Sequence, residues 1–171
     1  HTNTVGDENT AIGAKALFSN TIGSRNTAQG YQALYSNTSG SGNTAYGKYS
    51  QYSNLGGVSN TSMGVESLYH NKAWIGNTAI GYHAMKNSYN GTSWVVVSRN
   101  TAVGYRALLG SSDPLNSGAF NTAIGGEVLS SNVSGSGNTG IGDQSLYKNT
   151  SGDKNTACGS ESLYENSTGY R

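Results

Sequence analysis

The sequence predicts an all-β fold, a parallel β-solenoid built from about nine 17-residue coils. An Asn-Thr pair opens every unit, and the steps between successive pairs are all 17 except for one of 23 and one of 21. Each unit has Gly at its fifth position, and most have a second Asn eleven positions after the first. Such a period is typical of proteins whose units stack on one another. The opening asparagines are Asn9, Asn26, Asn43, Asn60, Asn77, Asn100, Asn121, Asn138 and Asn155.

Each unit is numbered from its first Asn as position 1, and we expect strands near positions 2–5 and 7–10. Turns are expected at position 6 and at 11–17, because "SNTSGSG" at 36–42 places Asn and Gly where a positive φ is needed. A helix pair does not suit a unit so rich in Gly and Asn. Nine coils at the usual strand spacing make a rod about 40 Å long. We expect residues 1–171 to form one repeat domain, a segment of a longer fibre.

The small and bulky positions of the unit predict how it packs. Positions 3 and 8 are nearly always Ala or Ser, whereas position 9 is usually Leu and position 4 is usually Ile, Val or Met. Side chains alternate across a strand, so we expect the small residues to face one way and the bulky ones the other. One coil can bury only one of these faces. The other would leave a long apolar stripe in water, which predicts an obligate oligomer.

Composition excludes several kinds of partner. The formal net charge of +1 offers no electrostatic argument for binding nucleic acid or an anionic membrane. No run of 18 apolar residues occurs, so we expect no membrane insertion. The single Cys158 rules out an internal disulfide, and at position 4 we expect it to be a small buried hydrophobe.

The sequence shows no pattern typical of an enzyme. His1, His70 and His83 are scattered, and no His or Cys cluster has the spacing of metal ligands. The carboxylates near the two interruptions of the repeat are Glu66, Asp113 and Glu127. We therefore expect no catalytic residues, no metal and no cofactor.

The motif N-T-A-I-G, followed by a small residue and Leu, resembles the head repeats of trimeric autotransporter adhesins. It is especially similar to repeats in phage tail fibres and in trimeric surface fibres of predatory bacteria. The resemblance covers essentially the whole chain outside the two interruptions, although the present unit has a longer second turn than many adhesin repeats. It implies a left-handed parallel β-roll, a homotrimer, and an extracellular fibre on a cell surface or virion used for attachment or host and prey recognition.

Two columns of side chains have alternative interpretations. Thr stands at position 2 of every unit, which suggests either an ice-binding face or a plain hydroxyl ladder on β-branched strand residues. Aromatic residues at position 10 form either a stripe on which sugars stack or a column of rings stacked on one another. This aromatic column is broken at Lys86, Leu109 and Ser130.

The longer steps of the repeat are insertions at 86–99 and 109–120, which both follow position 9. They therefore leave the rod at the same corner, one coil apart, and must lie side by side. Trp74 occupies the same corner in the preceding unit, where most units have Gly. Asn90-Gly91 is a strong signal for a tight turn, and 94–97 is expected to return as a short strand.

Long loops on rigid scaffolds commonly carry binding sites, and exposed aromatic rings beside polar groups suit a glycan. We expect a shallow carbohydrate or receptor site at this corner, with three copies in a trimer adding avidity. Alternatively, the loops wrap a neighbouring chain and their aromatic rings lock the trimer or fill a core at the corner. The chain could instead be a passive stalk spacer for a missing tip domain, or an ice-binding solenoid. The predicted site residues are Trp74, Tyr89, Asn90, Trp94, Asp113 and Phe120.

Overall fold

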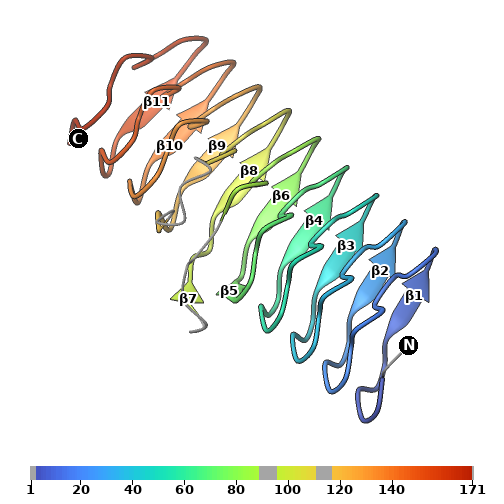
Figure 1. The fold of residues 1–171 in the computed structure, drawn as a ribbon. Coiled ribbons are helices and arrows are strands. Elements are labelled where there is room, and N and C mark those ends of the chain that lie inside the picture. The colour runs from blue at the N-terminus through green and yellow to red at the C-terminus, as the bar shows by residue number, and fades with distance from the viewer. Residues whose placement is uncertain (1–2, 89–95, 111–116, 171) are drawn as a thin grey trace.

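The computed structural model describes residues 3–88, 96–110 and 117–170, and they form a parallel β-solenoid (Figure 1). Nine strands stack in one sheet in the order β1-β2-β3-β4-β6-β8-β9-β10-β11, and no helix occurs in these ranges. The predicted fold class and its 17-residue period are confirmed. The strands are β1 Thr10–Ile12, β2 Thr27–Gln29, β3 Thr44–Tyr46, β4 Thr61–Met63, β6 Thr78–Ile80, β8 Thr101–Val103, β9 Thr122–Ile124, β10 Thr139–Ile141 and β11 Thr156–Cys158.

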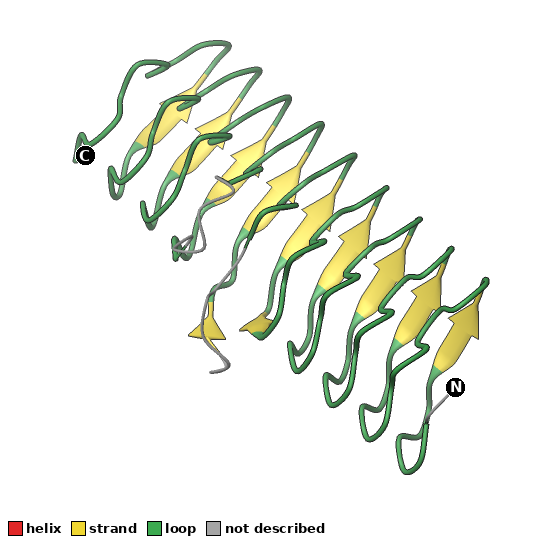
Figure 2. Ribbon diagram, in the orientation of Figure 1, coloured by secondary structure: helices red, strands yellow, loops and turns green. Residues whose placement is uncertain are grey.

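Each strand of this sheet covers positions 2–4 of its unit (Figure 2). The register pairs like with like, as in Thr10 with Thr27 and Ala11 with Ala28. The central small residue points into the coil, and Ala28, Ala79 and Ala102 have no exposed surface. Positions 2 and 4 point outward, as alternation requires. The expected first strand is therefore confirmed, one residue shorter than predicted.

The second strand predicted at positions 7–10 is wrong, because this segment is a series of turns. In every unit, positions 7 and 9 have positive φ without being Gly; φ is +55° at Gln32 and +49° at Leu34. A residue in this left-handed region breaks a strand and rotates the next side chain. The turns still join neighbouring coils, since Leu34 N–H donates to the Ser50 carbonyl at 3.0 Å.

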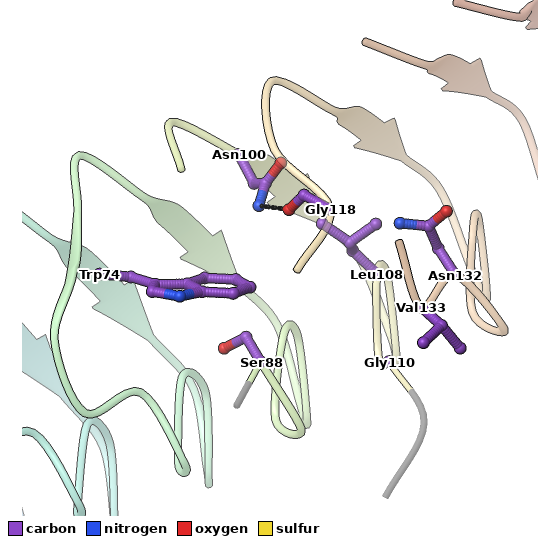
Figure 3. Close-up of a pocket in the computed structure, with 8 residues that line it drawn as sticks. All are labelled: Trp74, Ser88, Asn100, Leu108, Gly110, Gly118, Asn132 and Val133. Atoms are coloured by element: carbon purple, nitrogen blue, oxygen red, sulfur yellow. Dashed lines mark hydrogen bonds between the residues drawn. The ribbon is translucent and has the colours of Figure 1, made fainter. Parts of the chain in front are cut away.

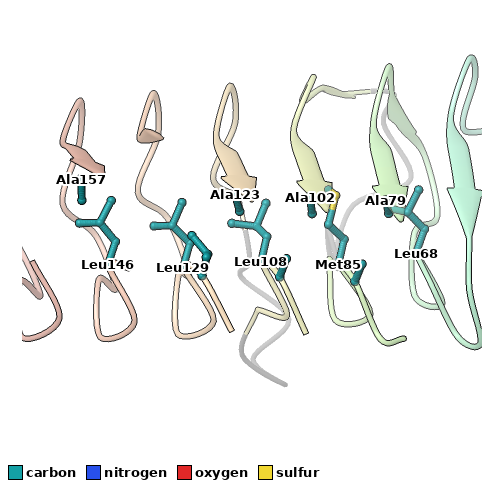
Figure 4. Close-up of a cluster of buried hydrophobic side chains, with 12 residues drawn as sticks. Leu68, Ala79, Met85, Ala102, Leu108, Ala123, Leu129, Leu146 and Ala157 are labelled. Carbon is teal, nitrogen blue, oxygen red and sulfur yellow. The ribbon is translucent and has the colours of Figure 1, made fainter. Parts of the chain in front are cut away.

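The left-handed turns place the bulky position-9 side chains inside the coil, which corrects the predicted two-faced packing. Leu68, Met85 and Leu129 are fully buried, and they meet the small residues of positions 3 and 8 in the core (Figure 4). Small and bulky residues thus share one interior instead of facing opposite ways. The position-4 side chains remain outside, where Ile12 is 55% exposed and Met63 is 49% exposed.

Two buried columns of asparagine, at positions 1 and 12, run along the rod beside this core. The Asn43 backbone N–H donates to Asn26 Oδ1 at 3.0 Å, and Asn43 Nδ2 donates to the Gly57 carbonyl at 2.7 Å. In the second column Asn54 Nδ2 donates to Asn37 Oδ1 at 2.7 Å. These amides satisfy backbone groups that the narrow coil turns inward, away from water.

A polar cluster divides the apolar core between the third and fourth coils. Gln51 takes the place of the usual Leu, and its Nε2 donates to the Thr44 carbonyl at 3.0 Å and to Ser62 Oγ at 2.9 Å. Ser50 Oγ is hydrogen-bonded to Ser67 Oγ at 3.1 Å. The hydrophobic clusters on the two sides of this cluster are separate. Gln51 therefore interrupts the Leu column with its Nε2 hydrogen-bonded, whereas its buried Oε1 has no partner among the described residues.

The side chain at position 8 of one coil contacts position 3 of the next coil. The pair Val128 and Gly140 shows how closely these two positions are packed. A Cβ on Gly140 would lie 2.5 Å from Val128 Cγ1. We expect Gly140→Ala to lower the free energy of unfolding by about 1–3 kcal/mol through overpacking. Adding Val128→Ala recreates the Ala-Ala pair of Ala16 and Ala28 and should recover most of the loss. Urea denaturation of both single variants and the double variant checks this; additive losses would contradict the contact.

Candidate functional site at the insertion corner

The described ends of the two insertions lie on neighbouring coils. Where the chain departs, the Asn87 backbone N–H donates to the Leu109 carbonyl at 3.0 Å, and Asn87 Nδ2 donates to the Gly110 carbonyl at 3.2 Å. Where it returns, the Phe120 N–H donates to the Ser98 carbonyl at 2.7 Å. Both insertions therefore leave and rejoin the rod side by side, as predicted for their ends.

A second, two-stranded sheet forms at this corner from β5, Trp74–Ile75, and β7, Val96–Val97. The strands are parallel and pair Trp74 with Val96 and Ile75 with Val97. The short returning strand expected over 94–97 is thus observed in its second half. It fastens the end of the first insertion to the preceding coil.

The structure describes two of the six predicted site residues, Trp74 and Phe120. Tyr89, Asn90, Trp94 and Asp113 lie outside the described residues. Phe120 lies at the last position of its unit, with φ +59° and 56% of its surface exposed, so its ring is accessible to a ligand.

Trp74 is 3% exposed, so the prediction of an exposed ring at this position is wrong. Its indole lies inside the solenoid and faces Ser88 across the interior (Figure 3). Ser88 stands at position 12, where most units have Asn, and the shorter side chain leaves room for the indole. Together with Asn100 and Leu108 the two residues line a cavity of about 20 Å³. Trp74 Nε1 has no hydrogen-bond partner among the described residues.

The aromatic column at position 10 is a stack of rings. Centroids lie 5.3 Å apart for Phe18 and Tyr35 and 5.1 Å apart for Tyr35 and Tyr52, with planes within 4°. Tyr69 continues the stack at 5.1 Å. The ring-on-ring interpretation is confirmed, and within the stack each ring face is covered by its neighbour instead of being open to a sugar. Lys86 ends this stack, with its Nζ 6.0 Å from the Tyr69 ring centroid.

A half-buried ionic cluster adjoins this end of the aromatic stack. Glu66 Oε2 lies 2.6 Å from Lys86 Nζ and 3.0 Å from His83 Nε2. The His70 ring packs edge-on against the Tyr69 ring, with 4.6 Å between the ring centroids. Sequence reasoning treated the histidines as scattered and missed this cluster. The signal was present, because Glu66 and His83 both occupy position 7 of consecutive units and so stack on adjacent coils.

The pKa values of the cluster follow from burial and charge. The hydrogen bond from Lys86 holds the pKa of Glu66 below its ordinary value. Burial lowers the pKa of His83, and the neighbouring Lys86 charge lowers it further. Burial likewise lowers the pKa of His70, with Lys86 adding to the effect.

The described residues at this corner present charged groups and aromatic rings. Among them, no three His, Cys, Asp or Glu side chains converge as metal ligands would. Cys158 is exposed, which corrects the expectation that it is buried; the reason is that position 4 faces outward. The part of the chain that the structure describes also holds no helix long and apolar enough to cross a membrane.

Comparison with known protein families, with curated proteins and with solved structures finds no match to this chain.

Trp74 and Phe120 should respond differently to truncation. Trp74→Ala empties the interior beside Ser88 and should lower the free energy of unfolding by about 3–5 kcal/mol. Phe120→Ala removes an exposed ring and should change it by no more than about 0.5 kcal/mol. Denaturant titration followed by far-UV circular dichroism measures both. Equal losses for the two variants would contradict the burial of Trp74.

Stability should fall on acidification. His70 and His83 have lowered pKa values when folded, so below the ordinary His value of about 6.5 the unfolded chain binds protons that the folded chain does not. The melting temperature should therefore drop between pH 7 and pH 5, and drop again below about pH 4.5 as Glu66 is protonated. The variant His70→Gln/His83→Gln should flatten the first drop in calorimetry. An unchanged slope would show that other groups cause it.

Proposed function

We propose that this chain is a non-enzymatic segment of a homotrimeric extracellular fibre, on a cell surface or a virion, that serves attachment or host and prey recognition. The observation that carries the proposal is the apolar column on the outer face of the nine-stranded sheet. Oligomer formation would cover this column, and a stiff rod of stacked coils suits a fibre.

The column consists of the position-4 side chains. Tyr46 is 48% exposed, Ile80 is 36% exposed and Ile141 is 40% exposed, although each lies on a strand within the sheet. Tyr82 and Tyr105, at position 6 beside the column, are also exposed. In-register pairing makes the stripe continuous along the sheet. Soluble monomers rarely present contiguous apolar surface of this extent.

Three parallel copies are the assembly that the similarity to adhesin repeats favours. In a parallel trimer the columns of the three chains would meet at equivalent heights, so each Ile or Met would face apolar side chains. The position-9 side chains from Leu17 to Leu146 do not contribute, since they are buried within each chain; Leu163, in the last coil, is 48% exposed. The oligomer therefore rests on position 4 alone and not on both bulky columns.

Attachment is assigned to the insertion corner, as a shallow site for a cell-surface glycan or receptor. Phe120 offers an exposed ring there, and the predicted partners Tyr89, Asn90, Trp94 and Asp113 belong to the same two insertions. Trp74 supports the corner from within the coil instead of contacting the ligand. The alternatives are that the insertions lock the trimer, or that the segment is a passive spacer for a tip domain.

An ice-binding solenoid is the second candidate, favoured by the threonines of position 2. They pair with one another in register along the sheet and share its outer face with position 4. Thr27, Thr44 and Thr61 are exposed, and their hydroxyls donate to no described residue. Thermal hysteresis of a monomeric sample would favour this function over the fibre.

Light scattering after size exclusion should give three times the 17.7 kDa mass of one chain. Ile80→Asp/Ile124→Asp places charge in the position-4 column and should yield a monomer with an unchanged circular dichroism spectrum. The control Ile22→Asp alters an exposed residue outside the strands and should remain trimeric. A monomeric parent chain, or dissociation of the control alone, would contradict the proposal.

A further inference from the structure

We propose that the insertion corner binds an acidic glycan, a polysaccharide carrying carboxylate or sulfate groups, through basic side chains around the base of the insertions. This inference rests on the proposed function and names the ligand class. The cations are Lys72, Lys86, Arg99 and Arg106.

The nearly neutral net charge conceals a strong separation of charge along the rod. Residues 48–106 contain five Lys or Arg and one acidic residue, Glu66, whereas residues 113–165 contain six acidic residues and two Lys. The middle coils therefore attract anions while the C-terminal coils repel them. Both insertions begin in or directly beside the basic part.

The four cations stand on the coils from which the insertions leave and to which they return, or on the coil before them. Lys86 lies two residues before the last described residue of the departing chain, Ser88, and exposed Arg99 directly follows the return. Lys72 lies on the preceding coil, near enough to Lys86 for both charges to act on His70. Arg106 is on the following coil, and its charge acts on His83. Lys72, Lys86 and Arg106 thus lie on three neighbouring coils around the two His rings, and Arg99 lies at the point of return.

Acidic side chains neutralise Lys86 and Arg106 only in part. Glu66 is shared between Lys86 and His83, and one carboxylate cannot satisfy all the N–H donors of an ammonium and an imidazole. The Arg106 Nη1 lies 3.5 Å from Glu127 Oε1, which is a long contact for an ion pair. The Arg106 side chain is 41% exposed, so a ligand can reach it. Donors therefore remain for the carboxylate or sulfate of a ligand.

A glycan fits this surface better than a nucleic acid. A duplex carries closely spaced phosphates and needs a long cationic track, but the rod turns acidic one coil beyond Arg106. A sugar acid separates its charges with neutral rings and hydroxyls. Such a polymer suits a few separate cations, with the half-buried His70 ring near Lys72 and Lys86 and the exposed Phe120 ring one coil beyond Arg99.

The test measures binding of polygalacturonate fragments to the intact chain by titration calorimetry, with dextran as neutral glycan and duplex DNA as the other polyanion. We expect polygalacturonate to bind, added salt to weaken it, and dextran and DNA to bind at least tenfold more weakly. Lys72→Gln/Lys86→Gln should reduce the affinity for polygalacturonate by roughly tenfold or more. The matched control is Lys148→Gln, since Lys148 also pairs with an acid, Glu165, at 2.8 Å and lies 5.5 Å from the Tyr164 ring centroid.

Each remaining outcome overturns the inference. Equal binding of DNA would assign the corner to polyanions in general, and loss of affinity in the Lys148 variant alone would move the site elsewhere. Binding of dextran but not polygalacturonate would keep a glycan site and remove its acidic specificity. A trimeric mass without any polygalacturonate binding would overturn the ligand class while leaving the proposed trimeric fibre intact.

Discussion

The hydrogen bonds of the two buried asparagine columns are the interaction on which the solenoid depends. Each coil is so narrow that its turns point backbone groups inward, and water cannot reach them there. An Asn amide accepts from the backbone of the next coil and donates to a turn carbonyl, as Asn43 does with Gly57 at 2.7 Å. This arrangement works only when adjacent coils place the same residue at the same height. The repetition of the sequence is therefore a condition for satisfying the interior.

The same constraint explains which features could be predicted from the sequence. The period, the first strand of each unit and the adjacency of the insertion ends follow from spacing alone. The inward turn at position 9 does not, because Leu34 and Gln32 adopt left-handed conformations that their residue types disfavour. The burial of Trp74 could not be predicted from the sequence either, since it depends on Ser88 interrupting an Asn column one coil later. The pair Glu66 and His83 was predictable by stacking equivalent positions.

The outer surface of the rod divides into regions with different chemistry. The sheet face is apolar and hydroxylated without charge, whereas the insertion corner combines cations with aromatic rings, and the C-terminal coils are acidic. An uncharged face suits permanent contact between identical chains, and a charged corner suits a partner that arrives from solution. The proposed assembly and the proposed ligand therefore use separate surfaces of one coil.

The departures from the repeat inside the core have a consequence for how the chain finds its own alignment. Coils with nearly the same sequence can pair one step out of place, skipping a unit, at little cost in backbone hydrogen bonds. Gln51 opposite Ser62, and Val128 opposite Gly140, are correct only in the native alignment. A skipped unit would leave an amide facing Ala or force Val128 against a methyl group. These irregular pairs therefore favour the native alignment of the coils over an alignment that skips a unit.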